Sequence, residues 1–408
     1  MPVISIFSGI FCREDETIAR LAAETGFGKI DDPHLIAEAH RVSGMSAEKL
    51  QRAFSGPASV FNNFTHEKER AVAFLKLALA EALEKDGLLL VGFCSHLAPP
   101  SISHILRTCL IADRGFRVAV AAEKAGLSEK EAVRAIRTAD QERAAWVASM
   151  HGVADPWAPN LYDVVIPMDK VGVEEAVGII GRNLRKDAVR VTAASRQAVR
   201  DFQLAARVET ALSREGHHVE VSADNGRVSL RINKKVLLLK RLKKELRAIA
   251  EKIPGVSEVD IRVGKGFHQS DIYRKVDFEV PSRVLLVDDE REFVQTLSER
   301  LQMRDVGSAV TYDGESALEM VQQDEPDVMI LDLKMPGIDG LEVLRRVKQS
   351  RPRIEVIVLT GHGSEADREK CMQLGAFAYL QKPVDIDLLS KTLRQAHEKV
   401  HRTRRRGE

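Results

Sequence analysis

The chain contains few cysteines, no long apolar run and no excess of charge of either sign. Its four cysteines, Cys12, Cys94, Cys109 and Cys371, show no paired spacing, which is typical of reduced thiols and argues against a disulfide framework or a zinc site. The apolar runs are of strand length and too short to cross a bilayer. Because 61 Lys and Arg residues nearly balance 60 Asp and Glu residues, no chain-wide field favours nucleic acid or a membrane surface.

We expect a cytoplasmic protein that folds as several α/β domains. No basic region precedes the first apolar run and no small-residue cleavage site follows it, so this run is predicted to be a strand and not a signal peptide. A chain of 408 residues is too long for one compact core. The pattern indicates a domain at 1–184, a linker at 185–200, a domain at 201–264, a linker at 265–281, a domain at 282–399 and a basic tail at 400–408, which we expect to be disordered.

In the last third of the chain, polar residues follow a series of apolar strands. Five strand-like runs alternate with amphipathic helical stretches, which predicts a parallel, doubly wound sheet. Ligands of such sheets lie beyond the carboxyl ends of the strands. The residues predicted at those ends are Asp288, Asp289, Asp332, Thr360 and Lys382.

These residue types suit phosphoryl chemistry. Three carboxylates in one crevice raise one another's pKa unless a cation lies among them, and their hard oxygens favour Mg²⁺. One carboxylate could then attack a phosphoryl group while Mg²⁺ and the Lys382 ammonium neutralise the transferred charge. The simpler alternative, in which Asp288 and Asp289 only cap the next helix, is disfavoured because Asp332 and Lys382 occur in register with them.

The stretches "VLLVDDE", "ILDLKMPGIDG", "VIVLTGHGS" and "GAFAYLQKP", in this order, resemble the receiver domain of bacterial response regulators in two-component signalling. The resemblance implies a flavodoxin-like (βα)5 fold whose Asp332 accepts a phosphoryl group from a histidine kinase. It also implies that Lys382 stabilises the phosphoryl group and that Thr360 and Tyr379 move on phosphorylation, although Tyr379 could instead be a packing residue. The implied Mg²⁺ ligands are Asp288, Asp289, Asp332 and the backbone carbonyl of Lys334.

Nothing resembling a DNA-binding module follows the receiver-like segment. Because only the basic tail comes after residue 399, the signal is expected to pass to the upstream domains or to a partner protein. DNA is not expected as a partner, since no helix-turn-helix follows.

The middle segment is predicted to be a small α+β module. The predicted elements, in chain order, are a helix, "DFQLAARVETALSREG", two strands joined at residues 224–226, a basic amphipathic helix and a last strand, "PGVSEVDIRV". This order resembles a BON domain, which implies an acidic lipid or a membrane-associated protein as partner. The basic side chains of residues 240–247 could meet phosphates or could form an ordinary solvated surface.

The first segment begins like a phosphate-binding loop. "VISIFSG" predicts a strand and a turn before a helix, yet the usual glycines, lysine and hydroxyl are replaced, leaving Gly9 and Arg13 as candidate nucleotide contacts. Glu14, Asp15 and Glu16 would repel a triphosphate but suit the start of a helix. Together with "IDDPHLI", "GLSEKEAVRAIRTADQERAAWV" and "NLYDVVIPMDKVGVEEAVGII", the stretch resembles the cytidylate kinase-like family, which implies a three-layer α/β fold like that of P-loop kinases.

Two hypotheses follow for the whole chain. In the first, the receiver controls a kinase-like domain that binds a nucleotide weakly or binds only a protein. In the second, the receiver regulates a working nucleoside monophosphate kinase whose phosphates are held by the arginines of two lid-like helices, although these arginines could instead form surface pairs. The lid-like arginines are Arg114, Arg117, Arg134, Arg137 and Arg143.

Overall fold

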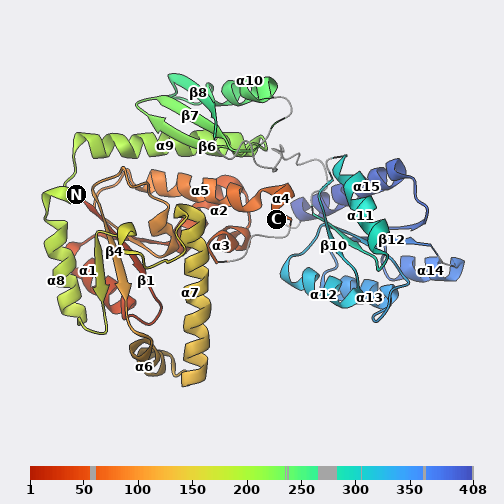
Figure 1. Ribbon diagram of the computed structural model, residues 1–408, viewed down its shortest axis with the longest axis horizontal. Helices are drawn as coiled ribbons and strands as arrows, with labels where there is room; N and C mark the ends of the chain where they lie inside the picture. Colours follow the sequence, from red (N-terminus) through yellow and green to blue (C-terminus); the bar gives the residue numbers. More distant parts are fainter. Residues whose placement is uncertain are drawn as a thin grey trace. The chain divides into compact units, whose positions relative to one another are not determined.

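The computed structural model describes residues 1–55, 61–234, 236, 239–264, 283–304, 306–361 and 364–406. The chain divides into two compact units, one formed by Met1–Ala58 and Lys68–Tyr273 and the other by Ser59–Glu67 and Arg274–Glu408. Figure 1 labels most of the helices and several strands of both units. None of the helices in the described ranges is long and apolar enough to cross a membrane. The linker predicted at 265–281 lies outside these ranges.

The first unit contains a five-stranded parallel sheet with the strand order β2-β3-β1-β4-β5. The strands are β1 (Val3–Ser8), β2 (Gly28–Asp31), β3 (Leu88–Val91), β4 (Ile105–Ile111) and β5 (Val164–Pro167). The helices are α1 (Glu14–Thr25), α2 (Asp32–Ser43), α3 (Ala47–Ser55), α4 (Asn62–Thr65), α5 (Glu67–Ala82), α6 (Arg114–Ala125), α7 (Glu129–His151) and α8 (Val173–Leu184), of which α4 belongs to the second unit.

The alternation of side chains along β1 explains the layers. Val3 packs into a core that includes α2, α3 and α5, while Ile4 and Ile6 point to the opposite face and pack with α1 and α8. Strands that are covered on both faces need apolar residues at successive positions, as "VISIF" provides. The expected three-layer α/β fold is confirmed.

Capping residues set the limits of the two arginine-bearing helices. The Asp113 side chain accepts a hydrogen bond from a backbone N–H at the start of α6, and Ser128 forms a capping box with Glu131 at the start of α7. Gly126 and Gly152 end these helices in the left-handed conformation. Short 3₁₀ turns follow β3 and precede β5, as η1 (Phe93–His96) and η2 (Pro159–Leu161), and a third, η3 (Asp187–Val189), follows α8.

A small α+β module completes the first unit. It consists of α9 (Ala193–Arg214), β6 (Glu220–Asp224), β7 (Arg227–Ile232), α10 (Leu239–Ala250) and β8 (Glu258–Val263). β6 and β7 form an antiparallel hairpin, and β8 runs parallel to β7. The turn expected at residues 224–226 is formed by Asn225 and Gly226, whose φ angles of 47° and 85° are both positive, as in a type I′ turn.

Helix α9 is shared between this module and the kinase-like core. Val208 and Leu212 pack against the small sheet, whereas Ala206 packs against α5, and the Gln203 amide donates to the carbonyl of Ala80. The helix begins at Ala193, after a capping box between Thr192 and Ser195. Residues 193–200, placed in a linker by the sequence pattern, are therefore the first turns of this helix.

The second unit contains a five-stranded parallel sheet with the order β10-β9-β11-β12-β13. Its strands are β9 (Val284–Val287), β10 (Ser308–Thr311), β11 (Val328–Leu331), β12 (Glu355–Thr360) and β13 (Ala378–Gln381). The helices that alternate with them are α11 (Arg291–Gln302), α12 (Gly314–Gln323), α13 (Gly340–Ser350), α14 (Glu365–Gln373) and α15 (Ile386–Arg406). The expected doubly wound (βα)5 fold is confirmed.

The end of the chain differs from the expectation. The tail was predicted to be disordered, but α15 continues to Arg406. Leu389, Leu393, Ala396 and Val400 are all buried along this helix, so that its packed face reaches the start of the tail. The arginines that follow are good helix formers and continue the helix beyond its last packed turn.

Candidate functional site

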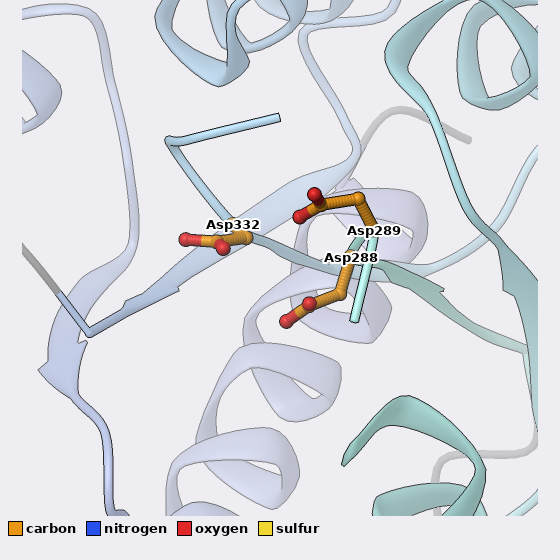
Figure 2. A group of neighbouring side chains, drawn as sticks. All are labelled: Asp288, Asp289 and Asp332. Atoms are coloured by element: carbon orange, nitrogen blue, oxygen red, sulfur yellow. The ribbon is translucent and has the colours of Figure 1, made fainter. Parts of the chain in front are cut away.

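Three carboxylates meet at the carboxyl ends of two neighbouring strands in the second unit. Asp288 and Asp289 follow β9, and Asp332 follows β11, which pairs with β9 in parallel register. Figure 2 shows these side chains together, and their ligand oxygens all lie within 4.8 Å of one another. Asp288 and Asp332 are only 4% and 7% exposed, whereas Asp289 is exposed to solvent.

Lys382 joins the two buried carboxylates. Its ammonium nitrogen Nζ lies 2.6 Å from an oxygen of Asp288 and 3.3 Å from an oxygen of Asp332. Burial raises the pKa of Asp288, although Lys382 opposes the shift. Burial acts to lower the pKa of Lys382, but the hydrogen bond to Asp288 and the two negative charges outweigh it, so that this pKa is raised. The backbone N–H of Lys382 donates to the carbonyl of Thr360, and the Lys382–Pro383 peptide is cis.

The backbone around Asp332 is closely packed. One Asp332 carboxylate oxygen accepts a hydrogen bond of 2.7 Å from the N–H of Leu333. A Cβ atom at Gly340 would lie 2.1 Å from the Asp332 carbonyl oxygen and 2.7 Å from the Leu333 Cα, so only glycine fits there. Gly340 is therefore a supporting residue of the site, although its role was not apparent from the sequence.

A cavity of about 410 Å³ lies over Asp332. Thr360 is 1% exposed at the end of β12 and reaches this cavity. Tyr379 does not line it: its ring packs against the apolar core, and its buried hydroxyl has no hydrogen-bond partner among the described residues. The lining residues are Glu290, Phe293, Asp332, Lys334, Thr360, Gly361, Lys382 and Pro383.

These residues fit a bound Mg²⁺ ion. The carboxylate oxygens are hard ligands, and the neighbouring cavity leaves space for the waters and phosphate oxygens that Mg²⁺ retains. Lys334, whose backbone carbonyl is the fourth expected ligand, lines the same cavity. The structure thus brings together every sequence-predicted residue of this site except Tyr379.

In the first unit, the turn between β1 and α1 is occupied by a side chain of the protein itself. The Glu14 carboxylate accepts hydrogen bonds from the backbone N–H groups of Phe11, at 3.2 Å, and of Cys12, at 2.8 Å. Phe11 and Arg13 have φ angles of 63° and 54°, a conformation that glycine adopts more easily. Burial raises the pKa of Glu14. The sequence pattern predicts Glu14 only at the start of a helix and gives no sign of its return to the turn.

The arginines expected to hold phosphates are used in two different ways. Arg117 forms two hydrogen bonds of 2.8 Å with Asp140 and donates a third to the carbonyl of Ile10, and Arg143 donates to the carbonyl of Ser8 at 2.6 Å. Arg13 pairs with Glu16 and with Glu123 on α6. Arg114, Arg134 and Arg137 are exposed.

The guanidinium of Arg117 also lies against Gly9, where an added Cβ would stand 3.1 Å from it. Of the lid-like arginines, Arg117 thus pairs with a carboxylate, but the pair is buried and not at the surface, while Arg143 donates to the carbonyls of Ser8, the last residue of β1, and Ala139.

Two family models match the segments that form the two five-stranded sheets. The model of the response regulator receiver domain matches residues 284–394. Residues 284–394 form a receiver domain. The model of the cytidylate kinase-like family matches residues 3–170, so that the first unit carries a cytidylate kinase-like domain. The BON-like resemblance of the middle module stays a prediction.

Individual proteins resemble the receiver domain. The transcriptional regulatory protein CpxR of Escherichia coli is 39% identical over 120 residues, which cover 28% of this chain and 51% of CpxR. The response regulator MprA of Mycolicibacterium vanbaalenii is 34% identical over 115 residues, covering 28% of this chain and 50% of MprA. The chain thus spans about half the length of the curated relatives it matches.

Among solved structures, the signal receiver domain of a LuxO repressor protein from Vibrio parahaemolyticus is 28% identical. The match covers 30% of this chain and 93% of that one, with a TM-score of 0.29.

Proposed function

We propose that the receiver domain accepts a phosphoryl group on Asp332 from a histidine kinase, with Mg²⁺ bound by the neighbouring carboxylates. The observation that carries this proposal is the meeting of three carboxylates within 4.8 Å, two of them joined by Lys382. A buried group of like charges with a single ammonium is arranged for a further cation.

Each residue has a distinct task in the transfer. A carboxylate oxygen of Asp332 forms the new bond to phosphorus while the phosphorus–nitrogen bond of the donor phosphohistidine breaks, so that the product is an aspartyl phosphate. Asp288, Asp289 and the Lys334 carbonyl would hold Mg²⁺, which supplies charge neutralisation at the phosphoryl oxygens when bound. Lys382 stands at the Asp332 oxygen and neutralises the same charge from within the protein.

Thr360 and Tyr379 are the proposed switch residues. Thr360 reaches the cavity in which the phosphoryl group would lie, so its hydroxyl could donate to a phosphoryl oxygen. Tyr379 lies on β13, next to the strand that carries Thr360, and its hydroxyl lacks a partner among the described residues. A shift of Thr360 toward the phosphoryl group would change the space that the Tyr379 ring fills.

The cytidylate kinase-like domain is proposed to act as a non-catalytic module that receives or passes on the signal. In a working phosphate loop the backbone N–H groups would bind phosphate oxygens, but here Glu14 accepts two of them. Arg117 is paired with Asp140, and Arg143 donates to the backbone carbonyls of Ser8 and Ala139, so both guanidiniums already have partners within the domain. The competing hypothesis of a receiver-regulated monophosphate kinase requires all of these contacts to break.

The basic helix α10 supports a weaker proposal about partners. Lys240, Arg241, Lys244 and Arg247 are exposed on it and could meet an acidic lipid or an acidic protein surface. The domain that resembles a BON domain would then link the receiver signal to a membrane-associated partner.

Phosphorylation of purified protein tests the main proposal. Incubation with acetyl phosphate and Mg²⁺ should give an adduct that is stable in acid and labile in base, which Asp332→Asn should lack. Asp313→Asn is a matched control, because Asp313 caps α12 and Asn caps equally well. Absence of an adduct on the wild-type chain, or its presence on Asp332→Asn, would contradict the assignment.

A separate assay decides between the two readings of the kinase-like domain. Wild-type protein mixed with ATP, Mg²⁺ and CMP is expected to form no ADP above background. Turnover that disappears when Arg143 is changed to Gln would show a working kinase and overturn the non-catalytic assignment.

A further inference from the structure

A second cavity lies on one face of the sheet in the cytidylate kinase-like domain, and none of the residues 9–14 lines it. Its volume is about 230 Å³. Ser5 of β1 and Arg107 of β4 are direct neighbours in the parallel register and form its floor. The other lining residues are Ser95, His96, Ala98, Pro100, His151, Asn160, Leu161, Tyr162 and Asp163.

Arg107 is a half-buried guanidinium without a carboxylate partner among the described residues. Its side chain donates to two neutral carbonyls, those of Pro99 at 2.8 Å and Ile105 at 3.4 Å. The nearby Asp163 carboxylate is occupied by the backbone N–H of Arg107 itself, at 2.8 Å. Burial lowers the pKa of Arg107, and Asp163 opposes the shift only in part. A cation withdrawn from water without an anion is unfavourable, so this wall of the cavity favours a negative ligand.

Arg117 of the same domain shows the contrast. It is 6% exposed and is satisfied by both oxygens of Asp140. Arg117 therefore carries its own carboxylate, whereas Arg107 donates only to neutral carbonyls and faces a cavity.

The histidines of the cavity form an ordered chain of hydrogen bonds. Tyr162 donates its hydroxyl proton to the carbonyl of Pro156, so its oxygen accepts from Nε2–H of His96, 3.3 Å away. Nδ1 of His96 is then an acceptor for Nε2–H of His151, 3.0 Å away. Burial and the charge of Arg107 lower the pKa values of both imidazoles, and His151 lowers that of His96 further. The lining therefore combines the positive charge of Arg107 and the hydrogen-bonding imidazoles with the carboxylate of Asp163, one oxygen of which accepts from the Arg107 N–H.

The volume limits the size of the ligand. A water molecule takes roughly 30 Å³ of liquid, so the cavity holds the equivalent of roughly seven or eight waters. Drug-sized ligands and nucleotides need larger pockets. Inorganic phosphate or a small carboxylate matches the space. The Ser5 hydroxyl, which has no hydrogen-bond partner among the described residues, stands beside Arg107 as a second donor.

We propose that this cavity is a binding site for a small oxyanion, either phosphate or a carboxylate of a few heavy atoms, with the Arg107 guanidinium as its main donor and Ser5 as a second. This site is separate from Asp332 and does not depend on receiver phosphorylation. It would give the kinase-like domain a ligand of its own even though its phosphate loop is occupied.

Tryptophan fluorescence of the full chain tests the proposal. The chain has two tryptophans, Trp146 and Trp157, both in the kinase-like domain, and Trp157 lies in the segment that runs into the cavity wall. Inorganic phosphate and acetate are titrated separately at constant ionic strength, with chloride as the balancing anion and without Mg²⁺. A saturable change with either anion that chloride does not produce is expected, and the anion that gives it identifies the ligand class.

Two variants locate the binding. Because hydrogen bonds to charged groups are the strong ones, Arg107→Gln is expected to weaken binding by about tenfold or more and Ser5→Ala by a smaller factor. Arg20→Gln, on the exposed surface of α1, is the control and should bind like the wild type. If Arg107→Gln does not fold, Ser5→Ala tests the proposal by itself, since it removes one hydroxyl from the cavity without changing the charge of the cavity. No saturable response to either anion, or equal affinity in the folded variants and the wild type, would overturn the proposal.

Discussion

Replacement of Glu14 provides a direct measure of what occupies the loop after β1. In the wild type, the Glu14 carboxylate accepts hydrogen bonds from the N–H groups of Phe11 and Cys12, and Cys12 is fully buried. Glu14→Ala removes both acceptors. Each buried N–H left without a partner costs about 1 to 3 kcal/mol, while release of a half-buried carboxylate and entry of water offset part of the loss. We therefore expect Glu14→Ala to lower the free energy of unfolding of the kinase-like domain by about 2 to 3 kcal/mol.

Two companion variants sharpen this measurement. Glu14→Gln keeps one acceptor oxygen and should lose only about 1 kcal/mol. Glu16→Ala removes a neighbouring carboxylate whose contacts with Arg13 and Lys124 are solvent-exposed ion pairs, so its effect should stay below about 1 kcal/mol.

Urea unfolding followed by tryptophan fluorescence reports on this domain alone, because both tryptophans lie within it. If Glu14→Ala and Glu16→Ala unfold at the same urea concentration, the carboxylate does not hold the turn and the reasoning fails.

Three further outcomes are expected. Gly340→Ala should push the Asp332 backbone aside and reduce the rate of adduct formation with acetyl phosphate at least tenfold, whereas Asp313→Asn, which keeps the cap of α12, should leave the rate nearly unchanged. Tyr379→Phe removes a buried hydroxyl without a partner among the described residues and should leave the receiver as stable as before or about 1 kcal/mol more stable, which urea unfolding followed by circular dichroism would measure. Burial lowers the pKa of His96 to about 3, so the unfolded chain binds its proton first as the pH falls below 6.5. Stability of the kinase-like domain should therefore drop by about 2 kcal/mol from pH 7 to pH 5, and His96→Gln should flatten that dependence.

The receiver fold and its acidic site could be predicted from the sequence because both depend on local pattern. Continuous apolar runs gave the buried strands, and a parallel sheet places the ends of those strands at one edge, so the positions of Asp288, Asp332 and Lys382 followed from counting along the chain. The same reasoning could not place Tyr379, since alternation along β13 does not say which apolar neighbours cover its ring.

The sequence could not predict contacts that depend on long-range packing. Nor could it predict a side chain that turns back to bind its own loop. Glu14 was expected at a helix start, and only the observed turn shows that it reaches Phe11 and Cys12. The neighbouring positions of Ser5 and Arg107 follow from the register of β1 and β4, which no single-sequence pattern specifies. For the same reason the pairing of His96 with His151, 55 residues later, could not be predicted.

Helix α9 limits where this chain can be divided into fragments that fold. Val199 belongs to the core of the kinase-like domain and Val208 to the core of the small module, so one unbroken helix contributes to both. A truncated protein that stops at residue 192 would expose apolar surface on α5, and one that starts at residue 201 would lose the first turns of the helix and its Thr192 cap. Fragments for expression, or fusions that use either part, should therefore keep the kinase-like core and the small module together and place no boundary within α9.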